Sequence, residues 1–410
     1  MSKIQSYNKL FIEDLQVKGK RVLVRVDFNV PLEESEGGVT VGDDRRIQES
    51  LPTIRWLARH GARTVLMSHL GRPKGKPDPK QGMAPVAARL TELLGTPVAV
   101  APDCIGAPVK AMVDRLKDGE ILLLENLRFH AEEEKNDTEF AKGLAALGDL
   151  YVNDAFGTAH RAHASTEGVT HHLRPAASGY LLKKELDYLG NALAAPRRPF
   201  VAIIGGAKIS GKIDVITSLF DTVDALIIGG GMAYTFYKAM GREIGGSILE
   251  PDRVELARQL LDQAKSRKAF ELHLPVDCVV ADRFDNDASQ HVVRSTAIPK
   301  DRQGMDIGPE TIGLFSKVIH HAKTVVWNGP MGVFEFPNFA DGTNAIAQAL
   351  AEATSRGAVT IVGGGDSAAA IKQAGLDKKV THVSTGGGAS LEFLEGKVLP
   401  GVAALDERKK

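Results

Sequence analysis

Short apolar segments recur along the whole chain, and the segments between them carry apolar residues at helical spacing. Apolar runs of this kind are typical of strands in parallel sheets, because helices cover both faces of such a sheet. Regular alternation of strand and helix indicates right-handed crossover connections. We therefore predict two parallel sheets. The predicted strands cover residues 22–26, 64–68, 97–101, 121–124 and 150–152 in the first half, and 200–204, 225–228, 273–280, 324–327, 358–362 and 379–383 in the second.

The length of 410 residues favours two domains, since a single core rarely grows to this size. Segment 179–194 has a helical pattern and is followed by prolines that end a helix. We predict an α/β fold of two Rossmann-like domains, residues 1–178 and 199–395, joined by an interdomain helix and linker at 179–198, with a cleft between them. The other predicted helices cover residues 47–59, 85–94, 213–220, 254–267, 343–353 and 367–374.

The segment VLVRVDFNVP, residues 22–31, places Arg25, Asp27 and Asn29 on one face of a predicted strand. An edge strand with a solvated polar face would show the same pattern. Strands of a covered parallel sheet are almost wholly apolar, however, and open α/β sheets bind ligands at the carboxyl ends of their strands. The pattern therefore predicts a site for a polar or anionic ligand.

The segment VAIIGGAKISGK, residues 201–212, is an apolar strand that enters a glycine turn. Lys208 and Lys212 are four residues apart, a spacing that would place both ammonium groups on one side of a helix. The turn nearly matches a phosphate-binding loop, but Ile213 stands where serine or threonine should bind Mg²⁺. Another residue must therefore hold the metal.

Two further glycine loops, TIVGGGDS at 360–367 and VSTGGGAS at 383–390, each follow a strand and open a helix. Exposed N–H groups at such a helix start bind phosphate, and Asp366 offers hard oxygen ligands for Mg²⁺ or, alternatively, a simple helix cap. Asn328 and Glu335 lie at another strand end, where a carboxylate can accept from ribose hydroxyls. These loops predict a nucleotide di- or triphosphate with Mg²⁺, and none has the spacing of a dinucleotide fingerprint.

Arginine and histidine residues follow several strands of the first half. Most isolated arginines are ordinary surface cations, but the carboxyl ends of parallel strands meet at one rim of a sheet. Guanidinium groups gathered there would bind a phosphate or carboxylate in bidentate fashion. The histidines at 160, 163, 171 and 172 do not form a zinc-binding spacing. The basic positions are Arg25, 45–46, 69–72, 128–130 and 154–165.

The composition of the chain limits which kinds of partner and which cellular compartment we expect. The 51 basic and 51 acidic residues give no net charge, so we expect no nucleic-acid partner. Cys104 and Cys278 are too far apart in sequence to suggest a disulfide framework, and Cys278 reads as an inert core thiol. The start of the chain lacks the apolar core of a signal peptide, and no apolar run approaches the length of a membrane span. We expect a cytoplasmic protein with no membrane partner.

Eight ordered motifs now show that the chain resembles the phosphoglycerate kinases over essentially its full length. This number of motifs in the same order is highly specific. The motifs are VLVRVDFNVP (22–31), SHLGRPKGKPDPK (68–80), LLLENLRFH (122–130), YVNDAFGTAHRAHAS (151–165), IIGGAKISGKI (203–213), WNGPMGVFEFPNFA (327–340), GGGDSAA (363–369) and STGGGASLEFLEGK (384–397).

The resemblance implies reversible Mg²⁺-dependent phosphoryl transfer from 1,3-bisphosphoglycerate to ADP, which yields 3-phosphoglycerate and ATP. It implies that the first domain binds phosphoglycerate, is completed by residues 396–410, and closes on the nucleotide domain, and that the protein is a monomer. By similarity, Asp27, Asn29, Arg46, His69, Arg72, Arg128 and Arg161 bind phosphoglycerate. Lys208, Lys212, Asn328, Glu335, Gly363, Gly364, Gly365, Asp366 and Ser367 bind the nucleotide, with Asp366 at the metal, and Arg46, Lys208, Gly386 and Gly387 stabilise the transferring group.

Two positions depart from the family pattern. Segment 32–44 is longer and more acidic than the usual turn, so the choice of Arg46 over Arg45 depends on the following Ile47. Ser367 stands where many members have threonine. Two other functions remain open at this point, a nicotinamide-dependent dehydrogenase and a non-catalytic nucleotide-binding scaffold, because doubly wound sheets host many functions.

Overall fold

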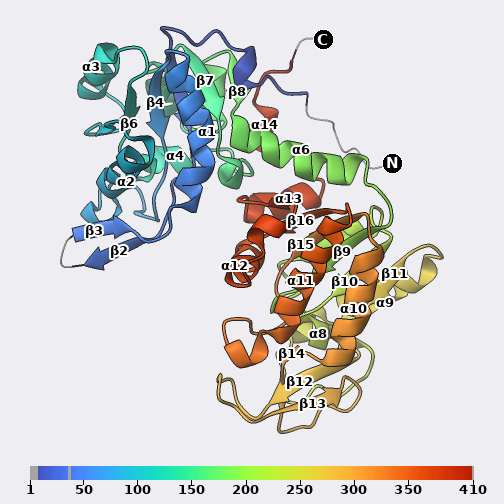
Figure 1. Cartoon of the computed structure of the whole chain (residues 1–410). Helices are drawn as coiled ribbons and strands as arrows, with labels where there is room; N and C mark the ends of the chain where they lie inside the picture. Colours follow the sequence, from blue (N-terminus) through green and yellow to red (C-terminus); the bar gives the residue numbers. More distant parts are fainter. Residues whose placement is uncertain (1–7, 36–37, 409–410) are drawn as a thin grey trace. The chain divides into compact units, whose positions relative to one another are not determined.

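The computed structural model describes residues 8–35 and 38–408, and the chain divides into two compact units (Figure 1). The first unit holds the described residues up to Asp187 together with those from Val398 onward. The second unit is Tyr188–Lys397. The division falls within α6 (Tyr180–Ala194), the helix expected between the domains. Segment 1–7, to which the expectation of no signal peptide refers, lies outside the described residues.

The first unit is built on a parallel sheet with strand order β5-β6-β4-β1-β7-β8. Its central strand is fully covered, since Val22, Leu23 and Val24 are all inaccessible to solvent. Helix α1 is amphipathic, with Ile47 and Ile54 buried on its inner face. The strands are β1 (Arg21–Arg25), β4 (Arg63–Met67), β5 (Ala99–Val100), β6 (Ile121–Leu123), β7 (Leu150–Asn153) and β8 (Ala176–Ser178); the helices are α1 (Arg45–Arg59), α2 (Ala84–Leu94), α3 (Ala107–Arg115), α4 (Ala131–Glu134), α5 (Thr138–Ala145) and α14 (Pro400–Ala403).

The end of the chain packs on the first unit. Helix α14 contacts the loop after β7, where Gly401 N donates to Ala159 O at 2.8 Å and Asn153 Nδ2 donates to Gly401 O at 3.2 Å. A bridge pairs Lys9 with Glu407 in antiparallel fashion. The C-terminal residues thus cover the outer strands of this sheet.

The acidic segment 32–44 forms an antiparallel hairpin of β2 (Leu32–Ser35) and β3 (Gly38–Val41), of which residues 36–37 are not described. The exposed side chains of the hairpin include Glu33 and Glu34. The segment is longer than the turn usual in the family that the sequence resembles, and this hairpin accounts for the additional length.

The second unit has a parallel sheet with strand order β11-β10-β9-β15-β16-β17. Figure 1 shows α10 and α11 side by side over these strands, and together they bury Phe315 and Leu350. The strands are β9 (Phe200–Ile204), β10 (Ala225–Ile228), β11 (Glu271–His273), β15 (Thr324–Asn328), β16 (Val359–Gly363) and β17 (His382–Val383); the helices are α7 (Ile213–Leu219), α8 (Met232–Ala239), α9 (Val254–Ser266), α10 (Pro309–His321), α11 (Asp341–Ser355), α12 (Gly365–Gln373) and α13 (Gly388–Leu394).

One strand prediction was wrong. Residues 273–280 do not form a single strand, because β11 ends at His273 and β12 (Asp277–Ala281) begins a separate antiparallel sheet with β13 (Gln290–Arg294) and β14 (Gln303–Ile307). Pro275 lies between the two strands and cannot donate to a ladder. The sequence also did not predict the strands β2, β3, β8, β13 and β14 or the helices α3, α4, α5, α8, α10 and α14. No helix in the described ranges has the length and apolarity required to cross a bilayer.

Candidate functional site

A cluster of charged side chains lies at the carboxyl edge of the sheet in the first unit. The strands β1, β4, β6 and β7 end there, so the loops that follow them bring together residues from distant parts of the sequence. The buried members are Arg25, Asp27, His69 and Arg128, each less than 8 % exposed. We call this set, with Asn29, Arg46 and Arg161, the basic cluster.

Asp27 organises one side of the basic cluster. Its Oδ2 accepts from Arg46 Nη1 at 2.8 Å, and its Oδ1 lies 3.9 Å from His69 Nδ1. Burial opposes ionisation of this carboxyl, but the nearby guanidinium groups of Arg46 and Arg25 and the backbone amide of Asn29 outweigh burial and lower its pKa. Arg45, by contrast, pairs with Asp43 at the surface, so Arg46 is the arginine of this pair that reaches the cluster.

His69 is held in one tautomer. Arg25 Nη2 lies 3.1 Å from His69 Nδ1, and because a guanidinium can only donate, Nδ1 must accept. Burial and the surrounding guanidinium groups lower the pKa of His69 well below its usual value. The imidazole is therefore neutral at physiological pH and carries its hydrogen on Nε2.

A buried chain of hydrogen bonds fixes Arg25 in turn. Arg25 Nε donates to Ser165 Oγ at 2.8 Å, and Ser165 Oγ donates to Glu133 Oε1 at 2.6 Å. Ser165 N also donates to Glu133 Oε2 at 3.0 Å, and both residues are fully buried. The sequence did not indicate Glu133 or Ser165, because Glu133 is one of three consecutive glutamates in the short helix α4 and Ser165 lies far from Arg25 along the chain.

The remaining predicted phosphoglycerate-binding residues lie on neighbouring loops. Asn29 Oδ1 accepts from Gly71 N, and Arg128 Nη1 donates to Gly71 O, both at 2.8 Å. Burial and the charges of Arg25 and Arg161 lower the pKa of Arg128, despite an ion pair with Glu134, so Arg161 is within electrostatic range of the cluster. Arg72 is exposed on the loop that carries His69.

In the second unit, glycine loops pack tightly at the ends of β9, β10 and β15. A Cβ added at Gly205 would come within 2.2 Å of Pro330 O, and one at Gly230 within 2.5 Å of Gly206 N. Gly206 and Gly364 also have positive φ values, of 101° and 87°, which other residues rarely adopt. These loops therefore require glycine for both space and backbone geometry.

Lys212 and Asn328 connect two of these loops. Lys212 Nζ donates to Gly205 O at 2.8 Å, to Asn328 O at 3.0 Å and to Asn328 Oδ1 at 2.7 Å. Burial lowers the pKa of Lys212 to about 8, although Asp366 opposes this shift. Asn328 Nδ2 is buried without a hydrogen-bond partner and faces Gly364, whose Cβ would lie 3.0 Å from it. Asn328 thus retains a donor directed at the 363–365 loop.

The helical-spacing argument for Lys208 and Lys212 was wrong, because neither residue lies in a helix. Residues 205–212 form a turn, and α7 begins only at Ile213. Lys208 is exposed. Burial opposes ionisation of Glu250, but hydrogen bonds from the side chain and amide of Ser210 and from the amide of Ile209, together with the charge of Lys208, lower its pKa.

A cavity of about 460 Å³ lies next to these loops within the second unit. It is lined by apolar groups such as Tyr234, Ile248 and Met331, and by the carboxylates of Glu335 and Asp366. Apolar walls with a few polar groups are typical of sites for small molecules. Gly206 and the glycine loop 229–231 contribute its backbone wall.

Asp366 and Ser367 lie in the first turn of α12, which begins after Gly363 and Gly364. Ser367 Oγ accepts from Gly329 N at 2.5 Å, so Ser367 fixes the neighbouring loop, whereas the Asp366 carboxylate is exposed. A single exposed carboxylate fits a magnesium ion that takes its other ligands from phosphate and water. Gly386 and Gly387 precede α13, where Gly386 N donates to Ser384 Oγ at 3.1 Å.

Comparisons with known proteins identify the family to which this sequence is similar. The sequence model of the phosphoglycerate kinase family matches residues 12–397. The phosphoglycerate kinase of Chlorobium chlorochromatii is 60% identical over 398 residues, which cover 97% of this chain and 99% of that protein. That of Koribacter versatilis is 59% identical over 408 residues, 98% of this chain and 100% of that protein.

Two solved structures have the same fold. The phosphoglycerate kinase of Coxiella burnetii has a TM-score of 0.87 and 42% identity, and the match covers 97% of this chain and 98% of that chain. The enzyme of Pyrococcus horikoshii has a TM-score of 0.83 and 32% identity, with the same coverage of 97% and 98%.

Proposed function

The chain belongs to the phosphoglycerate kinase family, and we propose that its two units divide the substrates of that reaction between them. As a member of the family it is a glycolytic phosphotransferase, which transfers a phosphoryl group from 1,3-bisphosphoglycerate to ADP and yields 3-phosphoglycerate and ATP. The observation that carries the assignment of sites is the basic cluster, in which cationic groups from several strand ends meet at one edge of a sheet.

The basic cluster is the proposed phosphoglycerate site. Arg46, Arg128 and Arg161, with Arg72 from the adjacent loop, supply guanidinium groups for the phosphate and carboxylate. Neutral His69 donates from Nε2, because Arg25 occupies its Nδ1. Asp27 and Asn29 are the other two residues proposed to bind phosphoglycerate.

The glycine loops and the cavity beside them form the proposed nucleotide site. Lys212 and Asn328 hold the loops together, and Ser367 fixes Gly329, while Asn328 Nδ2 and the amides of Gly363–Gly365 remain donors for phosphate oxygens. Glu335 is an acceptor for ribose hydroxyls at the cavity. Asp366 is the proposed ligand of Mg²⁺, which would neutralise the charge of the nucleotide phosphates.

Phosphoryl transfer here requires no general base, because the attacking oxygen is already an anion in both directions. The obstacle is the accumulated negative charge of two substrates. Arg46, Lys208 and the amides of Gly386 and Gly387 are the proposed groups that stabilise the transferring phosphoryl group. Lys208 is exposed, and its long stem lets the ammonium move toward the reacting group.

With the substrates on separate units, transfer requires a closed state in which the bound substrates meet and water is excluded. Solution scattering tests this directly. We expect the radius of gyration to fall when both substrates are bound, and an unchanged profile would contradict closure.

We further propose that the protein acts in the cytoplasm as a monomer. The two cysteines, Cys104 and Cys278, are buried and free, which supports a reducing compartment. Sedimentation of the purified protein at several concentrations tests this, and we expect the mass of a single chain at each concentration.

The activity is tested by a coupled assay for ATP formation from 1,3-bisphosphoglycerate, ADP and Mg²⁺. We expect turnover that depends on all three. A chain that binds both substrates without turnover would be a scaffold, and NAD-dependent oxidation would indicate a dehydrogenase; either result would overturn the proposal.

A further inference from the structure

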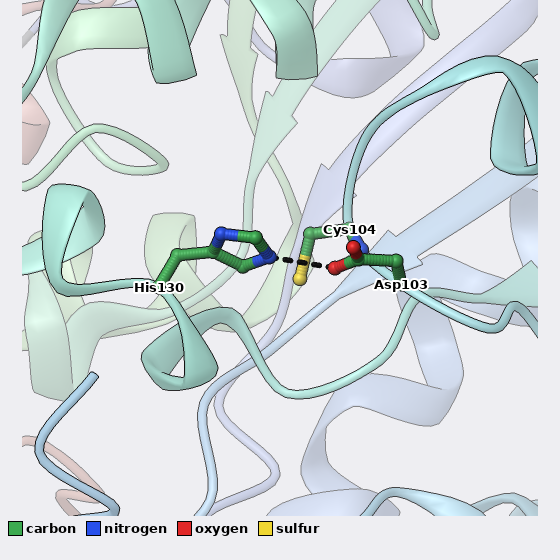
Figure 2. A group of neighbouring side chains, drawn as sticks. All are labelled: Asp103, Cys104 and His130. Carbon is green, nitrogen blue, oxygen red and sulfur yellow. Dashed lines mark hydrogen bonds and ion pairs between the residues drawn. The ribbon is translucent and has the colours of Figure 1, made fainter. Parts of the chain in front are cut away.

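The side chains of Asp103, Cys104 and His130 meet in the first unit, outside both proposed substrate sites (Figure 2). Asp103 and Cys104 follow β5, and His130 follows the turn after β6. In the part of the chain that the structure describes, this is the group in which a carboxylate, a thiol and an imidazole place their ligand atoms within 4.8 Å of one another.

We propose that Asp103, Cys104 and His130 form a binding site for a divalent transition-metal ion of the Zn²⁺ class. Sulfur, imidazole nitrogen and carboxylate oxygen together suit Zn²⁺ or Co²⁺, whereas Mg²⁺ prefers oxygen ligands alone. Three protein ligands leave a fourth tetrahedral position for water. The site is therefore chemically distinct from the magnesium position proposed at Asp366.

Packing holds two of the three ligands in place. Cys104 is fully buried, and its Sγ donates to Glu125 O at 3.1 Å. The His130 ring packs on Phe140 with centroids 4.9 Å apart. The Asp103 and His130 side chains are 49% and 26% exposed, so an ion has access from solvent.

Small movements bring the ligands to metal-binding distance. His130 Nε2 now lies 2.6 Å from Asp103 Oδ1 in a hydrogen bond, which Figure 2 shows beside the sulfur of Cys104. Ligand atoms about 2.0–2.1 Å from a tetrahedral zinc ion lie about 3.3 Å apart. The exposed Asp103 carboxylate must therefore move outward, and His130 must shift its hydrogen to Nδ1.

The thiol limits the affinity of the site. Burial, with the nearby carboxylates of Asp103, Glu133 and Glu125, raises the pKa of Cys104 well above its usual value. Metal binding must displace this proton, so the site binds more weakly than one with a preformed thiolate. A bound ion would link the loop after β5 to the turn that carries Arg128, and would thereby stabilise the native state.

The test is a Co²⁺ titration of the reduced full-length protein, followed by absorption spectroscopy. We expect one ion per chain, intense visible bands of a tetrahedral ion, and a thiolate-to-metal charge-transfer band in the near ultraviolet. Cys104→Ser removes the charge-transfer band, and Cys104→Ser or His130→Gln weakens binding by on the order of 100-fold.

A matched control is His171→Gln. His171 Nε2 lies 2.5 Å from Glu167 Oε1 in an exposed pair that resembles His130 and Asp103, and within residues 8–35 and 38–408 this pair belongs to no such three-ligand group. This variant should bind Co²⁺ like the unmodified protein. If Cys104→Ser does not fold, the partly exposed His130→Gln variant carries the test.

Three results would overturn the proposal. The first is a spectrum without a charge-transfer band at saturating Co²⁺. The second is Co²⁺ affinity that does not change in His130→Gln. The third is a charge-transfer band that persists in Cys104→Ser and so originates from Cys278.

Discussion

The two proposed substrate sites are built in opposite ways. In the first unit, the side chains that orient the site are buried and hydrogen-bonded to one another: Glu133, Ser165, Arg25 and His69 form a continuous chain. In the second unit, backbone loops are fixed by Lys212, but charges such as Lys208 and Asp366 are exposed.

The two sites therefore differ in how much conformational freedom their charged side chains lose when a charged ligand binds. Buried, mutually oriented cations lose little freedom when an anion arrives, so the first site is preorganised. Exposed charges lose more freedom on binding, and they gain orientation only from the ligand and its metal. We therefore expect substitutions in the first unit to change both stability and binding, and substitutions of exposed charges in the second unit to change function alone.

The largest expected effect is that of Lys208→Ala. Loss of a cation that acts mainly on the transferring group should lower kcat by about 100–1,000-fold, with a smaller change in KM and no change in Tm. Steady-state kinetics measure kcat and KM, and a thermal melt measures Tm. Lys238→Ala, at an exposed lysine of the same unit that pairs with Glu243, is the control and should keep full activity.

Arg46→Ala should reduce kcat to a similar extent and should also raise KM for phosphoglycerate, because it leaves the buried Asp27 without its 2.8 Å partner. An unchanged kcat in either variant would contradict its assigned role.

Asp366→Asn should raise KM for the magnesium nucleotide by about 10–100-fold, since a neutral amide is a poor ligand for Mg²⁺. Excess Mg²⁺ should partly restore activity. Asp262→Asn removes an exposed carboxylate that pairs with Lys265 on α9, and it should have no effect. If KM for phosphoglycerate changed and KM for the nucleotide did not, the assignment of Asp366 to the nucleotide site would be wrong.

Ser165→Ala breaks the buried chain that orients His69. It leaves Arg25 and Glu133 without their shared hydroxyl and should destabilise the protein by about 1–3 kcal/mol. Nitrogen-15 shifts of His69 should report a mixture of tautomers, and KM for phosphoglycerate should rise while KM for ADP does not change. Ser266→Ala, at an exposed hydroxyl on α9, is the control. A pure Nε2–H tautomer in Ser165→Ala would show that the chain does not hold His69.

One buried carboxyl in each unit should make the stability of the protein depend on pH. Burial raises the pKa of Asp154 to about 7 and that of Asp306 to about 7. Because the folded state binds the proton more tightly than the unfolded state, each group stabilises the protein below its unfolded pKa. That contribution is lost as the pH rises toward 7, by at most about 1.4 kcal/mol per pH unit per group.

The two carboxyls differ in their partners. Asp154 Oδ2 is buried without a hydrogen-bond partner, so Asp154→Asn should flatten the pH dependence and raise Tm near pH 8. Both oxygens of Asp306 accept backbone hydrogens, from Ile307 N and Gly342 N, so Asp306→Asn should lower Tm at every pH. Equal responses of the two variants would remove this distinction.

The sequence predicted the parallel sheets well because their strands are apolar on both faces. Strands such as Phe200–Ile204 and Ala225–Ile228 are buried throughout and are therefore unambiguous. The antiparallel sheet was missed because its strand β13 is almost wholly exposed and has no continuous apolar run. Strand β8 consists of small residues over only Ala176–Ser178.

The candidate site was predictable to the extent that its residues lie in local motifs. Arg25, Asp27 and Asn29 share one strand end, and Asp366 lies next to a glycine run. The contacts that orient them are not local: Ser165 reaches Arg25 only because β7 lies next to β1 in the sheet. The relation of Lys208 to Lys212 depended on whether the loop was helical, which their spacing alone did not determine.

The central claim is that each unit binds one substrate, and calorimetric titration of two variants tests it most directly. Titrations of 3-phosphoglycerate and Mg-ADP into the parent protein, Arg128→Ala and Asp366→Asn give six affinities. The account predicts that Arg128→Ala weakens only 3-phosphoglycerate binding and that Asp366→Asn weakens only nucleotide binding. The opposite pattern, or equal loss of both ligands in either variant, would contradict the division of substrates between the units.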